Sequence, residues 1–213
     1  MVELGVNGLV LWFEQELIAH KNSKQGNTNS DHAMKLETEQ QYQGILKDCK
    51  DIFSKKTKDY GTAWRILRLP SITDQILIKA QRIRSIQEKG TQKVGEDISN
   101  EFKGIINYCL IALIQMQLNG TEEMEIPFST LEPMYDKAAE DTLGLLKNKN
   151  HDYGEAWREM RVSSMTDIIL MKLMRVKQIE DNEGETIISE GVDANYQDMI
   201  NYSVFCLIKL AEN

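Results

Sequence analysis

Apolar residues recur every three or four positions in the segment that begins at Tyr42, as they do on one face of an amphipathic helix. The residues that carry this pattern are Tyr42, Ile45, Leu46, Cys49, Ile52 and Phe53. The pattern predicts a helix that runs toward Lys58. It should end near Gly61, because glycine readily takes the left-handed conformation that often follows a helix end.

Two further helices are expected in the first half of the chain. Ser71-Ile72-Thr73-Asp74 has the spacing of a capping box, which predicts that a second helix starts there. After a polar loop, the apolar run IINYCLIALI predicts a third helix from about Ile98 to Leu118. No run alternates with period two between turns, so strands are not expected and the predicted fold class is all-α.

The second half of the chain repeats this arrangement. DYGTAWR begins at Asp59, and DYGEAWR begins at Asp152. Residues 59–82 align with 152–175 without a gap, and INY at 106–108 returns at 200–202 after one extra residue in the second loop. This self-similarity indicates a tandem duplication. Since one three-helix unit has a limited core, we expect both to pack as a single pseudo-twofold helical bundle.

The expected organisation has four parts: an N-terminal extension with a flexible linker (1–33), repeat 1 (34–119), a connector (120–133) and repeat 2 (134–213). The opening apolar stretch is too short to span a bilayer and has no preceding basic residues. Residues 21–32 contain no large apolar residue, and Met34 precedes the first well-patterned segment. We therefore hypothesise that residues 1–33 are a dispensable extension or an upstream start.

Composition narrows the class of protein. The formal net charge of −8 over 213 residues argues against nonspecific attraction to nucleic acid or to an anionic membrane. The three cysteines are too few and too unevenly spaced for a disulfide framework or a zinc site, which fits a reducing cytoplasm. The sequence also lacks a Gly-rich phosphate loop of known spacing.

Four cations recur at matching positions of the two repeats. They are Arg65, Arg68, Lys79 and Arg82 in repeat 1, and Arg158, Arg161, Lys172 and Arg175 in repeat 2. Arginine can hold phosphate oxygens through two parallel hydrogen bonds, so these residues are candidates for nucleotide phosphate binding. The alternative is that they form ion pairs with retained acids and hold helix ends together.

Aromatic and amide residues recur as well. Tyr60 and Trp64, with Tyr153 and Trp157, could stack on a nucleobase, or the tryptophans could fill space between helices. Asn107 and Asn201 lie inside apolar runs, where an unpaired amide is costly. We expect them to be structural polar residues that bond to each other across the pseudo-twofold axis.

Two pairs of recurring aspartates invite a metal interpretation. Asp74 and Asp167 could bind Mg²⁺, but their distance from Ser71 and Ser164 favours helix capping. Asp59 and Asp152 fall near a helix carboxyl end, where an acid opposes the helix dipole. Each of these two should therefore have an arginine or a metal as a partner.

The repeated phrase KxxDYGxAWRxxR, the SxTD helix that follows it and the INY helix together resemble the family called Nucleotide modification associated domain 1. The residues that match its motifs are Asp59, Tyr60, Gly61, Trp64, Asn107 and Tyr108, with Asp152, Tyr153, Gly154, Trp157, Asn201 and Tyr202. The family occurs in bacteria and phages, sometimes as a tandem pair. The resemblance implies a helical domain that acts in nucleotide or modified-base metabolism, and a nucleotide or modified nucleotide as the partner.

An acid-bearing turn before the Asn-Tyr pair is similar to the helical nucleoside triphosphate pyrophosphatases, whose ExxE and ExxD motifs bind magnesium. This similarity implies Asp59, Glu101, Asp152 and Asp198 as candidate Mg²⁺ ligands. Glu101 aligns with Asn195, and Asp198 aligns with Gly104, so each repeat keeps a different half of the motif. The chain could thus share one composite catalytic site. Alternatively, it is a non-catalytic nucleotide-binding module or a structural interaction protein.

Overall fold

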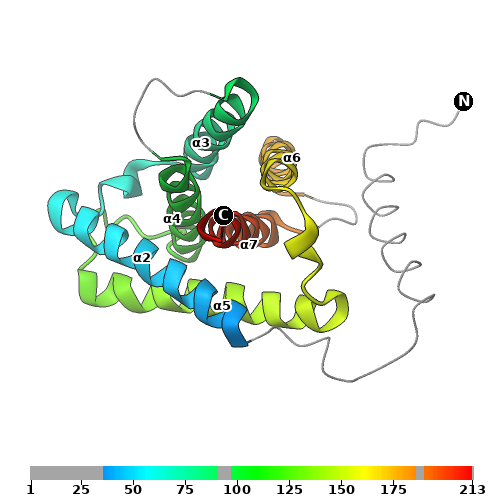
Figure 1. The fold of residues 1–213 in the computed structure, drawn as a ribbon. Helices are drawn as coiled ribbons and strands as arrows, with labels where there is room; N and C mark the ends of the chain where they lie inside the picture. The colour runs from blue at the N-terminus through cyan, green and yellow to red at the C-terminus, as the bar shows by residue number, and fades with distance from the viewer. Residues whose placement is uncertain (1–35, 91–96, 186–189, 213) are drawn as a thin grey trace, which may run out of the picture. The chain divides into compact units, whose positions relative to one another are not determined.

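The computed structural model describes residues 36–90, 97–185 and 190–212, and it describes no side chains for 150–153. The expected extension, residues 1–33, lies outside the described residues. The helices are α2 (Leu36–Tyr60), α3 (Leu69–Lys89), α4 (Ile98–Gln117), α5 (Phe128–Tyr153), α6 (Val162–Asp181) and α7 (Val192–Ala211), with the short 3-10 helices η1 (Ala63–Ile66) and η2 (Ala156–Glu159) (Figure 1). These ranges contain no strand, which confirms the all-α fold class.

The first helix of each repeat ends at the repeated DYG phrase. α2 ends at Tyr60, and Gly61 follows with a positive φ of 58°. Gly154 takes the equivalent position after α5 with a φ of 61°. The backbone N–H of Gly61 donates to the carbonyl of Thr57, at 2.9 Å. The left-handed glycine therefore turns the chain into the 3-10 segment that contains the AWR residues.

The second helices begin earlier than the capping-box prediction. α3 begins at Leu69, with Arg68 at its N-cap and a proline, Pro70, in its first turn, where the missing N–H costs nothing. Asp74 therefore lies beyond the first turn and cannot reach the capping residue, so the capping-box prediction is wrong. α5 begins at Phe128, inside the predicted connector, because the carbonyl of Pro127 already accepts helical hydrogen bonds.

The two repeats share one core. α4 and α7 lie side by side at its centre, and α3 packs on α4 as α6 packs on α7 (Figure 1). α3 also packs against α6 across the repeats. The central residues Ile105, Leu110, Ile200 and Val204 are fully buried. This arrangement confirms the predicted pseudo-twofold bundle of two repeats.

The cysteines belong to this core. Cys49, Cys109 and Cys206 are buried and free. Burial raises the pKa of the Cys49 thiol to about 12, and it raises the pKa of the other two thiols as well. None of the three therefore supplies a thiolate nucleophile at neutral pH.

Candidate anion-binding site

The arginine of the first AWR phrase fixes the hinge to the connector. Arg65 is buried and donates to the carbonyls of Glu123 (3.2 Å) and Thr121 (2.8 Å). It also donates to Gln115 Oε1 at 2.6 Å, and Gln115 returns hydrogen bonds to the carbonyls of Arg65 and Leu67. The guanidinium of Arg65 is thus taken up by neutral acceptors of the protein.

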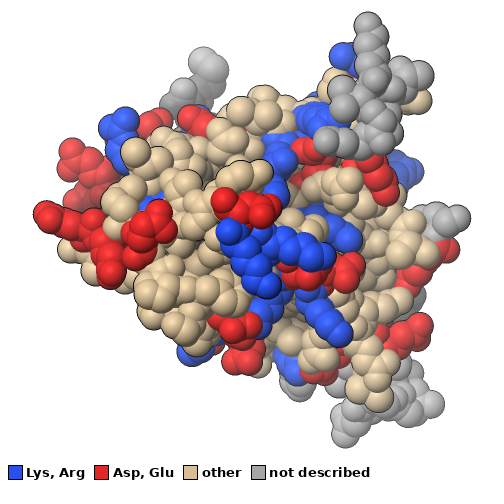
Figure 2. Space-filling model, turned by 90° about the vertical axis from the view of Figure 1, so that its left-hand side faces the viewer, with Lys and Arg blue, Asp and Glu red and all other residues tan. Residues whose placement is uncertain are grey.

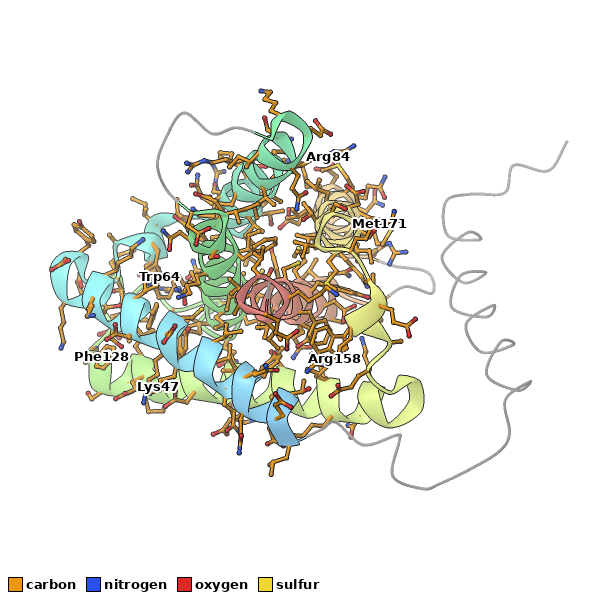
Figure 3. The ribbon with its side chains drawn as sticks, viewed as in Figure 1. Lys47, Trp64, Arg84, Phe128, Arg158 and Met171 are labelled. Atoms are coloured by element: carbon orange, nitrogen blue, oxygen red, sulfur yellow. The ribbon has the colours of Figure 1, made fainter. Side chains whose placement is uncertain are left out.

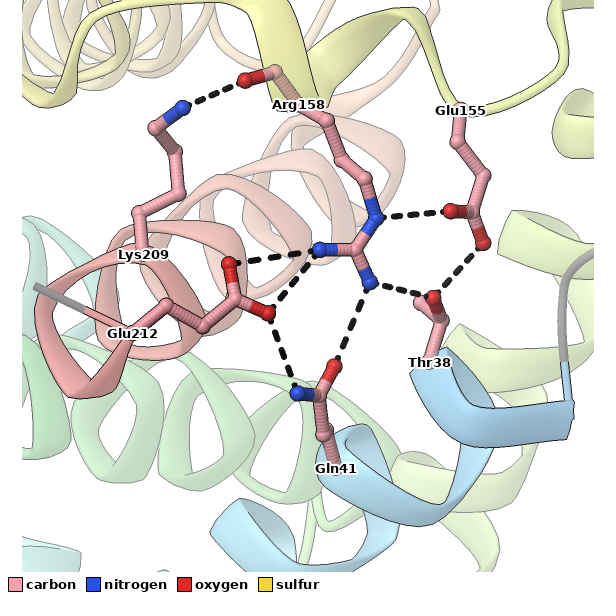
Figure 4. Close-up of polar contacts among 6 residues, drawn as sticks. All are labelled: Thr38, Gln41, Glu155, Arg158, Lys209 and Glu212. Atoms are coloured by element: carbon pink, nitrogen blue, oxygen red, sulfur yellow. Dashed lines mark hydrogen bonds and ion pairs between the residues drawn. The ribbon is translucent and has the colours of Figure 1, made fainter.

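The arginine of the second phrase, Arg158, joins three parts of the fold (Figure 4). It donates to Glu155 Oε2 (2.7 Å), Glu212 Oε1 (3.0 Å), Thr38 Oγ1 (2.7 Å) and Gln41 Oε1 (3.3 Å). The ammonium of Lys209 donates to its backbone carbonyl. Arg158 therefore ties η2 to the start of α2 and the end of α7. We call these six residues the Arg158 latch. The guanidinium groups of Arg65 and Arg158 are thus both bonded to acceptors of the protein, and phosphate binding by either stays a prediction.

Two of the recurring arginines cap helices. Arg68 and Arg161 occupy the N-cap positions of α3 and α6, and both side chains are exposed. Neither forms an ion pair within the described ranges. They stay candidates for phosphate contact.

The remaining cations of repeat 1, Lys79 and Arg82, form ion pairs with a buried acid, Glu101. Arg82 Nη1 lies 2.6 Å from Glu101 Oε1, and Lys79 Nζ lies 3.3 Å from Glu101 Oε2. Glu101 is only 4% exposed. The stem of Lys79 lies over Gly104, where a Cβ would come within 2.7 Å of Lys79 Cε. A side chain at position 104, such as the aspartate that repeat 2 has at Asp198, would therefore require Lys79 to move.

Repeat 2 places its buried acid one turn later. Asp198 accepts from Lys172 (2.6 Å) and from Lys149 (2.7 Å), one ammonium on each carboxylate oxygen. Burial alone would raise the pKa of Asp198, but the two lysines outweigh burial and hold that pKa below its usual value. Asp198 is therefore ionised at neutral pH.

Among the described residues, Arg175 has no carboxylate partner, because the buried acid of repeat 2 lies at Asp198 and not at the position that matches Glu101. Arg175 is the counterpart of Arg82, but Asn195 stands where repeat 1 has Glu101. In the described part of the chain, no acid lies within ion-pair distance of Arg175. Asn195 is 3% exposed; its amide nitrogen donates to the carbonyl of Gly191, and its Oδ1 has no partner there. We call Lys149, Lys172, Arg175, Asn195 and Asp198 the repeat 2 cation cluster.

The candidate magnesium ligands do not gather in this way. Glu101 and Asp198 lie on different helices, and each carboxylate is engaged by two cations. Asp59 is exposed, and the side chain of Asp152 lies outside the described set. Among the described residues, no three His, Cys, Asp or Glu side chains come together as a metal site. Magnesium binding by these residues stays a prediction.

The other recurring aspartates pair across the repeats. Asp74 accepts from Lys177 at 2.6 Å, and Asp167 lies 3.7 Å from Arg84. Lys177 and Arg84 occupy matching positions of α6 and α3. These acids therefore help to join α3 to α6, a role that neither the capping nor the magnesium interpretation anticipated.

The tryptophans belong to the packing. Trp157 stacks on Phe205 with centroids 4.3 Å apart, and the guanidinium of Arg158 lies 4.5 Å from the Trp157 ring centroid. Trp64 packs against the core, whereas Tyr60 is 69% exposed. The side chain of Tyr153 is outside the described set. Among the described candidates for base stacking, only Tyr60 presents most of its ring to solvent.

Asn107 and Asn201 bond to tyrosines and not to each other. Asn107 accepts from Tyr135 (2.8 Å) and donates to the carbonyl of Cys49, while Asn201 accepts from Tyr42 (2.6 Å). The predicted asparagine pair is therefore wrong, because a tyrosine from the first helix of the other repeat reaches each amide. The sequence did contain a sign of these tyrosine–asparagine bonds, since Tyr42 and Tyr135 occupy matching positions of the two repeats.

A hollow of about 420 Å³ lies between α3 and α6, near Arg84 and Met171 (Figure 3). Its lining is largely apolar: Leu77, Gln81, Arg84, Asp167, Leu170, Met171 and Met174. The one cation in the lining, Arg84, pairs with Asp167. The lining includes no residue of the repeat 2 cation cluster. On the face in Figure 2, lysine and arginine are bordered by acids, so that face has no continuous basic surface.

Comparisons with known proteins assign the chain to a family. No curated protein and no solved structure matches it. No helix within the described ranges is long and apolar enough to cross a membrane. One family model matches twice, over residues 56–116 and 149–210, which together make up more than half of the chain. The two matches contain the hinge, second helix and third helix of each repeat. The chain belongs to the family Nucleotide modification associated domain 1, of which it carries two copies in tandem.

Proposed function

We propose that this protein binds a nucleotide through its phosphates, at the repeat 2 cation cluster. The observation that carries the proposal is an excess of positive charge. Lys149 and Lys172 both bond to one buried carboxylate, Asp198, and the exposed Glu190 also acts on Lys149. Arg175, the counterpart of Arg82 on α6, has no acid within ion-pair distance among the described residues. The family's name, which associates it with nucleotide modification, supports a nucleotide as the anion.

The three cations have different parts in this proposal. The side chain of Lys149 is 46% exposed, whereas that of Lys172 is 11% exposed. Arg175 is partly exposed. Lys149 and Arg175 can therefore contact phosphate oxygens, with arginine able to hold two oxygens in parallel. Lys172 stays on Asp198 and keeps that carboxylate from repelling the ligand.

A binding measurement tests the proposal. We expect nucleoside triphosphates, ordinary and modified, to raise the melting temperature and to bind in calorimetry. Arg175→Ala should weaken binding at least about tenfold, the effect of one lost charge-assisted contact. Lys56→Ala is the control, because Lys56 is an exposed cation outside the cluster and is not a candidate for phosphate contact. Failure of every nucleotide to bind, or equal affinity in Arg175→Ala, would overturn the proposal and favour a structural role.

Magnesium-dependent pyrophosphohydrolysis stays a prediction, and whether the chain is an enzyme is a separate question from binding. The same nucleotides, incubated with Mg²⁺ or Mn²⁺ and read by chromatography for monophosphate and pyrophosphate, test it. Metal-dependent product that disappears in a folded Asp198→Ala variant would support catalysis. Binding without product would leave the protein as a nucleotide-binding module.

A further inference from the structure

We infer that each chain has one anion-binding site and not two. Glu101 blocks the cations of repeat 1, whereas Asn195, at the matching position of repeat 2, leaves Arg175 able to bind an anion. The inference rests on the proposed function, because it concerns the same cluster. It gives a role to Asn195, which none of the sequence motifs marks as part of a site.

Repeat 1 is closed by its own acid. Glu101 is almost fully buried and uses both carboxylate oxygens, one on Arg82 at 2.6 Å and one on Lys79 at 3.3 Å. An incoming phosphate would have to displace a buried carboxylate from two cations and leave it without a partner, which is costly. The cations of repeat 1 are therefore unavailable to an anion.

Repeat 2 lacks that acid at the same position. Asn195 is as buried as Glu101 but has no charge, and its side-chain oxygen has no hydrogen-bond partner within the described ranges. Arg175 therefore does not donate to Asn195 in the way that Arg82 donates to Glu101. Among the described residues, therefore, the Arg175 guanidinium has no carboxylate and the buried Asn195 oxygen has no partner, whereas the matching positions of repeat 1 form an ion pair. A phosphate group can bind the first, and a ligand hydroxyl or a water molecule can bind the second.

Asp198 does not close repeat 2 in place of the missing glutamate. Its two oxygens are engaged by Lys149 and Lys172, at 2.7 and 2.6 Å. Lys149 comes from α5, and its counterpart in repeat 1, Lys56, is exposed and has no ion pair among the described residues. Compared with repeat 1, repeat 2 thus has one more cation at its acid, and its Arg175 has no ion pair in the described part of the chain. The two changes together make repeat 2 the more positive of the two clusters.

Exchanging the two side chains tests this inference, with inorganic triphosphate as the probe in isothermal titration calorimetry. We expect one site per wild-type chain. Asn195→Glu should weaken binding at least tenfold, because it supplies Arg175 with the carboxylate that Arg82 has. Asn195→Gln is the matched control, since glutamine has the size of glutamate without its charge, and it should bind within about threefold of wild type.

The reverse exchange, Glu101→Asn, should raise the stoichiometry toward two. The outcomes separate the two proposals. No binding by the wild type overturns the proposed function and this inference together. Binding at two sites in the wild type, or equal affinity in Asn195→Glu and Asn195→Gln, overturns the inference and leaves the proposed function standing. If Glu101→Asn fails to fold, the comparison of Asn195→Glu with Asn195→Gln still tests the inference.

Discussion

The hydroxyl of Tyr42 donates a 2.6 Å hydrogen bond to Asn201 Oδ1, which joins the first helix of repeat 1 to the last helix of repeat 2. The pseudo-twofold counterpart of this bond runs from Tyr135 to Asn107 at 2.8 Å. Tyr42 is completely buried, and Asn201 nearly so. Each repeat therefore supplies the hydrogen-bond donor for a buried asparagine of the other repeat. The duplicated unit thus needs a second copy to satisfy its buried amide.

Removing the Tyr42 hydroxyl should destabilise the fold. Tyr42→Phe keeps the ring but leaves the buried Asn201 oxygen without this donor, at a cost of about 1–3 kcal/mol. Urea denaturation measures the change in the free energy of unfolding. Tyr60→Phe is the control, because the Tyr60 ring is exposed and its loss should change stability by less than about 0.5 kcal/mol. Equal stability of the two variants would show that the bond contributes nothing.

One repeat alone should not form a stable monomer. A fragment of residues 34–119 exposes the face of α4 that packs on α7, and it leaves Tyr42 without Asn201. We expect it to be largely unfolded, or to dimerise with a copy of itself in place of repeat 2. Mixing it with residues 120–213 should restore helical circular dichroism. Sedimentation of fragment 34–119 as a folded monomer would contradict this prediction.

The helices and the duplication could be predicted because each produces a pattern along the sequence: a period of apolar residues for the helices and a repeated motif for the duplication. The period of apolar residues after Tyr42 and the run from Ile98 to Leu118 correspond to α2 and α4. Asn107 and Asn201 were also identifiable, since an amide in an apolar run needs a partner. Their partners were not, because periodicity identifies the buried face of a helix and does not identify the helix that it meets.

The roles of the cations depended on contacts that have no sequence signature. Arg65 bonds mainly to backbone carbonyls of residues 121–123, and a carbonyl is the same in every residue. Arg82 and Arg175 look equivalent in the alignment, yet only Arg82 has a buried glutamate. That difference arises from Glu101 and Asn195, which the alignment places opposite each other without showing how close they come to the arginines.

The charge of Asp198 should make stability depend on acid pH. Its pKa is lowered in the folded state, because Lys172 and Lys149 outweigh the effect of burial. This contribution to stability is therefore present above the unfolded-state pKa, about 3.9 for an aspartate, and is lost as pH falls through the lower folded-state value. Asp198→Asn should lose about 3 kcal/mol at pH 7, since it leaves a buried lysine unpaired. It should also show a shallower decline in acid. Parallel pH profiles for wild type and variant would contradict this account.

Glu180 should have the opposite effect. Burial raises the pKa of this carboxyl, although hydrogen bonds from Thr73 and Tyr196 oppose the rise. An acid with a raised folded-state pKa stabilises the fold below its unfolded-state pKa, and that contribution is lost as pH rises through the folded-state value. The matching residue in repeat 1 is Gln87, which donates to Thr166.

Glu180→Gln should therefore stabilise the protein at pH 7, by less than about 1 kcal/mol because the site is partly open to solvent. The gain should vanish near pH 4, where wild-type Glu180 is protonated. Urea midpoints at the two pH values measure this, with the exposed Glu140→Gln as the control. A gain that persists unchanged at pH 4 would mean that the charge of Glu180 is not its cause.

The Arg158 latch should hold the start of α2 in place. Its guanidinium bonds Thr38 and Gln41 of α2 and Glu212 after α7, so it bridges residues from both ends of the described chain. Arg158→Ala should cost about 1–3 kcal/mol and increase amide hydrogen exchange in the first turns of α2. Arg158→Lys should restore little, because one ammonium cannot reproduce the planar fork of donors. The exposed Arg161→Ala should leave both readouts at the wild-type level. If Arg158→Lys kept wild-type exchange in α2, charge alone would explain the contact, and the fork geometry would not matter.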